Sequence, residues 1–175
     1  LIGSSVTEVR RRAKVLLIDL SSEYTLVIHL KMTGQLVFRG EAVFGAGHPN
    51  DSLIGELPDR STRVTLTFTD GSHLYFNDQR KFGWIKLVPT AEVGQDTLVA
   101  RLGPEALSDG FSVAFLQAQL DRHKRALIKP TILDQATVAG VGNIYADEAL
   151  HLARLHPRRL SGSLTSTEVR RLHGA

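Results

Sequence analysis

The 175-residue sequence contains no cysteine, one methionine and one tryptophan. Without cysteine there can be no disulfide and no thiolate zinc site, which fits a reducing compartment such as the cytoplasm. No uninterrupted apolar run is longer than the four residues Val15–Ile18, whereas a membrane-spanning helix needs roughly 20. We therefore expect no membrane partner. Hydrophobic residues at 42% and charged residues at 22% are close to the globular average, which argues against disorder, collagen and coiled coil.

The ends of the sequence and its charge give further bounds. The chain starts at Leu1 rather than methionine and stops inside a helical pattern, so we interpret it as a segment of a longer protein. The formal net charge is only +3, but basic residues gather at Arg10–Lys14 and again at Arg122–Lys129. Each cluster is a candidate phosphate-binding surface. A solvated face is an equally good interpretation of either cluster alone.

The first half of the chain has the pattern of an antiparallel sheet. Its β-branched and aromatic runs are short and bounded by turn residues: Val15–Leu20, Thr25–Lys31, Arg63–Thr69, His73–Phe76 and Trp84–Val88. Asp70-Gly71 between two of these runs predicts a hairpin with a positive φ. Residues 40–60, rich in glycine and proline with little periodicity, predict a long mobile loop.

From Phe111 onward the hydrophobic period becomes helical. Ser112 is a plausible N-cap for a first helix, and Pro130 opens a short second one. A third helix is expected from Asn143 to near Pro157. Thr165 and Glu168 have the spacing of a capping box and predict a helix at the end of the chain.

Two segments carry chemistry. In Val138–Glu148, two glycines precede a helix that starts at Asn143, so unpaired amides at a positive dipole end could hold a phosphate. A simple helix entry is the more common meaning of such a turn. In Asn77–Trp84, Arg80 and Phe82 share one face by the period of two. A ring beside a guanidinium can enter a base stack, although spacing alone favours a phenylalanine that packs inward.

The joint occurrence of several motifs changes these odds. In chain order, the sequence resembles the formamidopyrimidine-DNA glycosylase family (Fpg/Nei) at six places. They are Arg11-Arg12-Ala13-Lys14, His29 to Gly34, Asp78 to Gly83, Leu102-Gly103-Pro104-Glu105, Ile128-Lys129-Pro130 and Gly140 to Ala146. Each piece alone is weak, but the ordered set is specific and runs over nearly the whole chain.

The resemblance implies an α+β fold in which an antiparallel β-sandwich lobe precedes a helix-two-turn-helix lobe, with DNA bound between them. We assign residues 1–88 to the sandwich lobe, 89–110 to a connector and 111–175 to the helical lobe, and we regard both lobes as partial. Members of the family excise oxidised purines, formamidopyrimidine and 8-oxoguanine, from duplex DNA and then cleave the abasic strand as AP lyases. They use the amine of an N-terminal proline as the nucleophile of a Schiff base, next to an acid/base glutamate.

Leu1-Ile2 does not correspond to that terminus, and the C-terminal zinc finger of the family requires cysteines that this sequence lacks. We therefore expect the chain alone to have no cofactor and no glycosylase activity. The expected partner is duplex DNA that contains oxidised purines or abasic sites, bound by a monomer in the cytoplasm of a bacterium, close to the nucleoid. The alternatives are an inactive truncated paralogue that binds damaged DNA and, less favoured, an RNA- or ribosome-associated module.

The resemblance also assigns roles to individual residues. Lys14 corresponds to the lysine that contacts a phosphate near the lesion and assists β-elimination. Met32, Arg80 and Phe82 correspond to the wedge that fills the gap left by the everted nucleotide. DNA contacts are expected from the set His29, Arg80, Lys81, Lys124, Arg125 and Asn143, whereas Tyr145 is expected to pack. Asp78–Phe82 and Met32 favour the formamidopyrimidine branch over endonuclease VIII.

One position departs from the family pattern. Many members place a DNA-contacting histidine just before the hairpin, where this sequence has Ser61. The histidine role is not transferred to Ser61, and the sequence does not decide whether Arg60 or Arg63 replaces it electrostatically.

Overall fold

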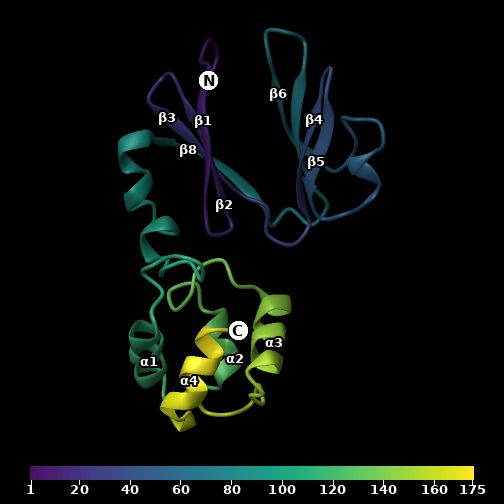
Figure 1. Ribbon diagram of the computed structural model, residues 1–175. Coiled ribbons are helices and arrows are strands. Elements are labelled where there is room, and N and C mark those ends of the chain that lie inside the picture. The colour runs from purple at the N-terminus through teal and green to yellow at the C-terminus, as the bar shows by residue number, and fades with distance from the viewer. The chain divides into compact units, whose positions relative to one another are not determined.

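The computed structural model describes all 175 residues and divides them into two compact units. We call Leu1–Val93 the β unit and Gly94–Ala175 the helical unit (Figure 1). The segment 89–110, expected as a connector, is divided between them. The 3₁₀ helix η2, Thr90–Gln95, spans the boundary, and η3, Val99–Arg101, belongs to the helical unit.

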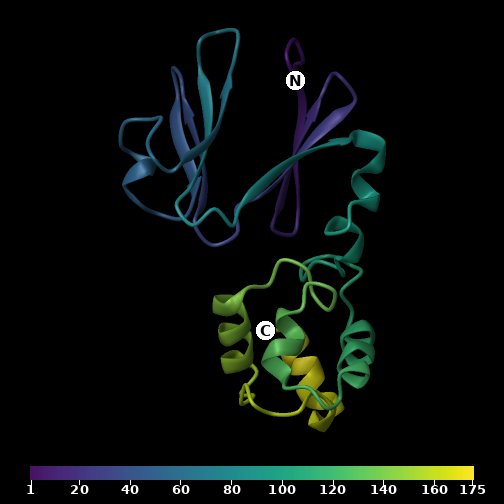
Figure 2. The same cartoon turned by 180° about the vertical axis from the view of Figure 1, so that it is seen from behind.

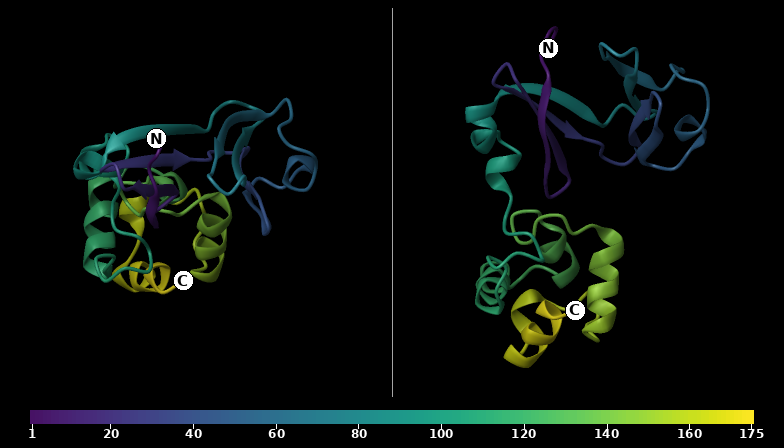
Figure 3. Two further views of the ribbon diagram at one scale, coloured as in Figure 1. Left: turned by 90° about the horizontal axis from the view of Figure 1, so that it is seen from above. Right: turned by 45° about the horizontal axis from the view of Figure 1, so that its top comes forward.

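The β unit is a sandwich of two four-stranded antiparallel sheets (Figures 1 and 3). Sheet A has the strand order β1-β2-β3-β8, and sheet B has the order β5-β4-β7-β6. The strands are β1 Val6–Arg12, β2 Val15–Leu20, β3 Tyr24–His29, β4 Gly34–Arg39, β5 Val43–Gly47, β6 Thr62–Thr67, β7 His73–Asp78 and β8 Trp84–Pro89.

The core of the β unit is formed by alternate residues of facing strands, as the two-residue period of a strand requires. The buried apolar cluster contains Ile18, Leu20, Leu26 and Ile28 from sheet A and Leu36 and Phe76 from sheet B. Partly buried side chains from β6 and β8 pack against it. The fold is therefore α+β, with an antiparallel sandwich followed by a helical part, as expected.

The sequence patterns placed some strands correctly and missed others. The hairpin between β6 and β7 is confirmed, with Gly71 at φ +85°. β1 was missed because its run of basic residues does not show the apolar alternation of a strand. The Arg10 guanidinium in β1 forms hydrogen bonds of 2.6 and 3.1 Å with Asp19 on the neighbouring strand β2. Arg10 therefore ties two strands together, and its assignment to a phosphate-binding cluster is not supported by this geometry.

The expectation of a long loop at residues 40–60 was wrong. This segment contains edge strand β5, which pairs with β4, and the 3₁₀ helix η1, Asp51–Leu53. Its chain is held against sheet B by polar contacts, including a hydrogen bond of 2.8 Å from Arg39 Nη2 to the Leu53 carbonyl. Glycines along an edge strand removed the periodicity that would have marked it.

The helical unit contains α1 Val113–Arg122, α2 Ile128–Leu133, α3 Asn143–Leu152, the 3₁₀ helix η4 Ser161–Ser163 and α4 Ser166–His173. α1 and α3 lie on opposite sides of this unit with α2 and α4 between them (Figures 1 and 2). Both expected caps are present. The Ser112 hydroxyl accepts from the Phe115 amide, and Thr165 and Glu168 form a reciprocal capping box. None of these helices is long and apolar enough to span a bilayer.

The third helix begins at Asn143 as expected but ends at Leu152, five residues before Pro157, so its end was placed too late. The chain turns at Arg154, which has φ +52°, and the Leu155 amide donates to the Leu150 carbonyl at 2.9 Å. This bond has the spacing of a Schellman C-cap, in which glycine usually occupies the left-handed position. With arginine there, the sequence carried no visible stop signal.

Candidate nucleic-acid interface

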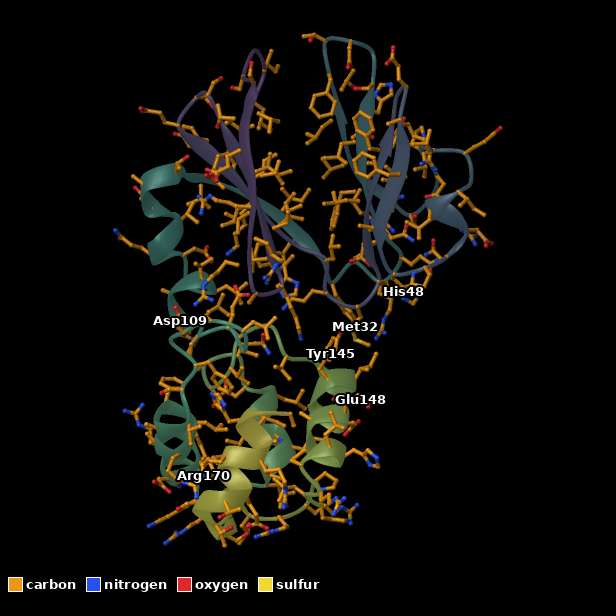
Figure 4. The ribbon with its side chains drawn as sticks, in the orientation of Figure 1. Met32, His48, Asp109, Tyr145, Glu148 and Arg170 are labelled. Atoms are coloured by element: carbon orange, nitrogen blue, oxygen red, sulfur yellow. The ribbon has the colours of Figure 1, made fainter.

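Two turns of the β unit bring Met32, Arg80 and Phe82 together. We call Leu30–Thr33, between β3 and β4, and Gln79–Gly83, between β7 and β8, the wedge turns. The Arg80 guanidinium carbon lies 4.9 Å from the centre of the Phe82 ring, and Arg80 Nη1 lies 3.9 Å from the Met32 sulfur. Met32 is 66% exposed and Phe82 54% exposed, so neither packs inward. Figure 4 shows Met32 at the end of its turn.

The sheet topology makes the wedge turns neighbours. Each turn crosses from one sheet to the other, and the strands on both sides are paired: His29 lies opposite Trp84 in sheet A, and Gly34 lies opposite Asp78 in sheet B. Two crossovers anchored at both ends in this way must run side by side. The juxtaposition of Arg80 and Phe82 thus comes from a turn rather than from the strand period that the sequence suggested.

Each wedge turn needs a glycine where it ends: Gly34 directly follows the first turn, and Gly83 closes the second. A Cβ on Gly34 would lie 2.3 Å from the Leu30 carbonyl oxygen, and one on Gly83 would lie 2.8 Å from the Phe76 ring. Lys31 and Lys81 both adopt positive φ, +54° and +58°, which fits tight reversals of the chain. Lys81 lies between Arg80 and Phe82 in the chain, and its side chain is exposed.

The sequence reasoning assigned no role to Asp78, the last residue of β7. Its carboxylate accepts from the Thr33 hydroxyl, from the Arg80 amide at 3.2 Å and from the Gly83 amide at 2.6 Å. Burial opposes ionisation, but these donors and the Phe82 amide lower the pKa of Asp78 below its usual value. One buried carboxylate therefore binds both wedge turns.

His29 and Lys14 form a second group in the β unit. The His29 ring lies 5.9 Å from the Trp84 ring, and its Nδ1 accepts from the Lys31 amide at 2.9 Å. Burial, followed by the charges of Lys31 and Lys14, lowers the pKa of His29 to about 4. At neutral pH the imidazole is thus uncharged, and the Nδ1 bond assigns its proton to Nε2. Burial also lowers the pKa of Lys14.

In the helical unit, the glycine turn before α3 is held by one side chain. Gln135 Nε2 donates to the Val141 carbonyl at 2.9 Å, and Gln135 Oε1 accepts from the Gly140 amide at 2.9 Å. α3 then begins at Asn143 with no side chain capping its first amides. Those amides and the helix dipole therefore offer an anion site next to Asn143.

Three other residues bear on this unit. Tyr145 is 73% exposed in the first turn of α3 (Figure 4), so the expectation that it packs was wrong. Lys124 and Arg125 are exposed in the loop after α1, and the Lys124 carbonyl accepts from the Gly162 amide at 3.1 Å. Lys129, in the same basic cluster, instead forms an ion pair of 2.7 Å with Asp147.

Ser61 has a structural role. It is buried, and its hydroxyl donates to Asp59 Oδ1 at 2.6 Å. Burial raises the pKa of Asp59, but hydrogen bonds from Ser52, Ser61 and Thr62 have the larger effect and lower this pKa to about 2. Arg63, one of the two candidates to replace the missing histidine, donates from Nε to the Asp78 carbonyl at 2.9 Å.

These residues do not form a zinc site. The sequence has no cysteine, and no group of three or more histidine, aspartate or glutamate side chains gathers where a metal ion could bind.

The β unit is thus a sandwich that exposes an aromatic ring and a guanidinium at two neighbouring turns, and the helical unit presents the uncapped N-terminus of α3. Both units have counterparts among known proteins. The formamidopyrimidine-DNA glycosylase N-terminal domain matches residues 1–85, and the H2TH domain of the same enzymes matches residues 102–175. Together these two matches cover nearly the whole chain.

The chain is also similar to curated proteins and solved structures. It is 45% identical over 170 residues to the formamidopyrimidine-DNA glycosylase of Pelotomaculum thermopropionicum, covering 97% of this chain and 56% of that protein. The structure of MutM (Fpg) from Thermus thermophilus is 41% identical with a TM-score of 0.80, covering 98% of this chain and 57% of the other. The Lactococcus lactis enzyme, solved bound to DNA with an AP site, is 29% identical with a TM-score of 0.83, covering 98% and 60%.

The chain belongs to the formamidopyrimidine-DNA glycosylase family. It spans a little over half the length of these relatives.

Proposed function

We propose that these 175 residues are the DNA-binding and wedge part of a base-excision repair enzyme, a DNA glycosylase and AP lyase that removes oxidised purines. The observation that supports this best is the cluster of Met32, Arg80 and Phe82 at the wedge turns. A large exposed apolar surface at a turn costs free energy in water unless it has a partner. Base pairs offer such a partner when one nucleotide has left the stack.

In this proposal the Phe82 ring takes the stacking place of the everted base, while the Arg80 guanidinium occupies the space facing the opposite strand. Stacking the guanidinium on Phe82 presents both groups as one unit. Met32 contacts the guanidinium from the other turn and fills the remaining gap.

The other residues bind the sugar-phosphate backbone. His29 donates from Nε2 as a neutral imidazole, and Lys14 supplies a nearby positive charge and assists β-elimination at the abasic sugar. In the helical unit, Asn143 and the open amides of α3 bind a second phosphate. Lys81, Lys124 and Arg125 add charges that act without regard to sequence.

The family nucleophile is a terminal proline, and the first proline in this sequence is Pro49. We therefore expect the 175 residues to bind DNA without forming a Schiff base. Borohydride treatment with an 8-oxoguanine duplex should give no covalent adduct. An adduct would identify another amine, with Lys14 the first suspect, as a nucleophile. The setting we propose is the bacterial cytoplasm, where chromosomal DNA is the substrate.

The wedge is tested by Phe82→Ala. Stacking a base on an aromatic ring contributes about 1–3 kcal/mol, so affinity for a duplex with an abasic site should fall roughly tenfold while affinity for intact duplex stays nearly unchanged. Phe44→Ala is the matched control, because Phe44 is also exposed but lies on β5 and stacks on Phe38. Equal losses on both duplexes would contradict the wedge role.

A further inference from the structure

Asp78 is nearly inaccessible to solvent, with 1% of its surface exposed. It nevertheless lies at the end of β7, directly before the wedge turn in which Arg80 and Phe82 are exposed. A buried carboxylate is costly unless hydrogen bonds compensate for the lost water. Here the two carboxylate oxygens accept hydrogen bonds from both wedge turns. Oδ1 accepts from the Thr33 hydroxyl in one turn and from the Arg80 amide in the other, and Oδ2 accepts from the Gly83 amide.

The backbone of Asp78 is fixed as well. Its amide donates to the Ser61 carbonyl at 2.8 Å, and its carbonyl accepts from Arg63 Nε at 2.9 Å. Both contacts come from the β6 side of sheet B. The carboxylate is therefore a fixed point to which both wedge turns are attached, and charge-assisted bonds of this kind are stronger than neutral ones.

The side chains of the wedge have no comparable support of their own. Met32 and Phe82 are mostly exposed, and the contacts recorded among the three are a cation–π contact and a weak sulfur contact. Such contacts are weak at exposed sites. Their relative placement must therefore come from the backbone of the two turns.

We infer that Asp78 is the positioning residue of the wedge: by binding Thr33, Arg80 and Gly83 at once, it holds Met32, Arg80 and Phe82 in the arrangement that enters the base stack. This inference rests on the proposed function, because the wedge is its object. It predicts that loss of the carboxylate lowers the preference for damaged DNA, not merely the stability of the fold.

The first measurement follows the wedge without DNA. Met32 is the only methionine, so labelling with methyl-¹³C methionine gives a single resonance from the wedge. Asp78→Asn leaves one oxygen in place of two, so either the Oδ1 or the Oδ2 set of bonds is lost. We expect this resonance to shift toward that of a free methionine, while far-UV circular dichroism stays unchanged.

The second measurement uses DNA. Asp78→Asn should lower the preference for an abasic duplex over an intact one by several-fold, approaching the loss caused by Phe82→Ala. In the Phe82→Ala background, Asp78→Asn should cause a smaller further loss than in the parent chain, because only Met32 and Arg80 are left for it to position. Thr33→Val should reproduce part of the effect, and Thr33→Ser, which keeps the hydroxyl, should restore the preference.

Asp70→Asn is the matched control. Asp70 also accepts from a neighbouring serine, through its amide and its hydroxyl, but it lies before β7, at the opposite end of that strand from Asp78. It should leave the Met32 resonance and the preference unchanged.

An unshifted Met32 resonance in Asp78→Asn, or additive losses in the double variant, would overturn the inference. If Asp78→Asn does not fold, Thr33→Val decides the same question. If Phe82→Ala itself leaves the preference unchanged, the proposed function fails, and the Met32 resonance still decides whether Asp78 holds the wedge turns.

Discussion

The neutral His29 imidazole leads to a quantitative prediction about salt. Its pKa is about 4, because burial and the charges of Lys31 and Lys14 disfavour the imidazolium. At pH 7 on the order of one ring in a thousand is charged. Even if a bound phosphate raised this pKa by about two units, only about one ring in ten would carry a charge.

A phosphate contact made by a charged side chain releases a counterion, and each such contact contributes about 0.9 to the slope of log affinity against log salt. The exposed Lys124 ammonium makes a contact of this kind in our proposal, whereas His29 makes a neutral hydrogen bond. Lys124→Ala should therefore lower the slope by about 0.9, and the affinity difference from the parent chain should shrink about 3.5-fold between 50 and 200 mM salt. His29→Ala should lower affinity by the same factor at every salt concentration.

Fluorescence anisotropy of a labelled abasic duplex at pH 7, titrated at several salt concentrations, measures both slopes. Comparing slopes rather than affinities also removes any constant effect of a variant on the fraction of folded protein. A loss of slope in His29→Ala equal to that in Lys124→Ala would show that the imidazole is charged when bound. The assignment of His29 as a neutral donor would then be wrong.

Three further predictions concern the supports of the interface. Gln135→Ala should destabilise the helical unit by about 1–3 kcal/mol, because the Gly140 amide and the Val141 carbonyl lose their partner; urea unfolding followed by helical circular dichroism measures this, and an unchanged midpoint refutes it. Ser61→Ala should destabilise the β unit by about 1 kcal/mol without altering DNA affinity; reduced affinity in a fully folded variant would return Ser61 to the interface. Asp59 has a folded pKa of about 2, below its unfolded value, so its stabilisation is complete above the unfolded pKa and disappears as the pH falls toward 2. Asp59→Asn and the parent chain should accordingly differ in stability at pH 7 and converge in acid, and a constant difference would contradict the cause given for the shift.

Local patterns in the sequence were sufficient to predict those features that depend only on residues a few positions apart. The Ser112 cap, the capping box of Thr165 and Glu168 and the turn at Gly71 each depend on groups within a few residues. Such features form from short-range sterics and hydrogen bonds, so they can be predicted without knowing the fold. The strand β2 was placed correctly for a similar reason, since its apolar run needs no partner to be recognised.

The role of a polar residue was harder to predict, because its partner lies far along the chain. Arg10 belongs to a basic run in the sequence but bonds Asp19 across a strand pair. Tyr145 was expected to pack and is exposed, because the face that a helix buries is set by the helices that pack against it. No local pattern contains that information.

The wedge likewise has a part that the sequence predicted and a part that it did not. The sequence by itself determined that Arg80 and Phe82 lie near one another and, through the resemblance, that Met32 belongs with them. Only the tertiary structure decided how they meet: the pairings of β3 with β8 and of β4 with β7 place two crossovers side by side. Asp78 bonds Thr33 from 45 positions away, and a contact of that kind exists only after the two sheets have formed.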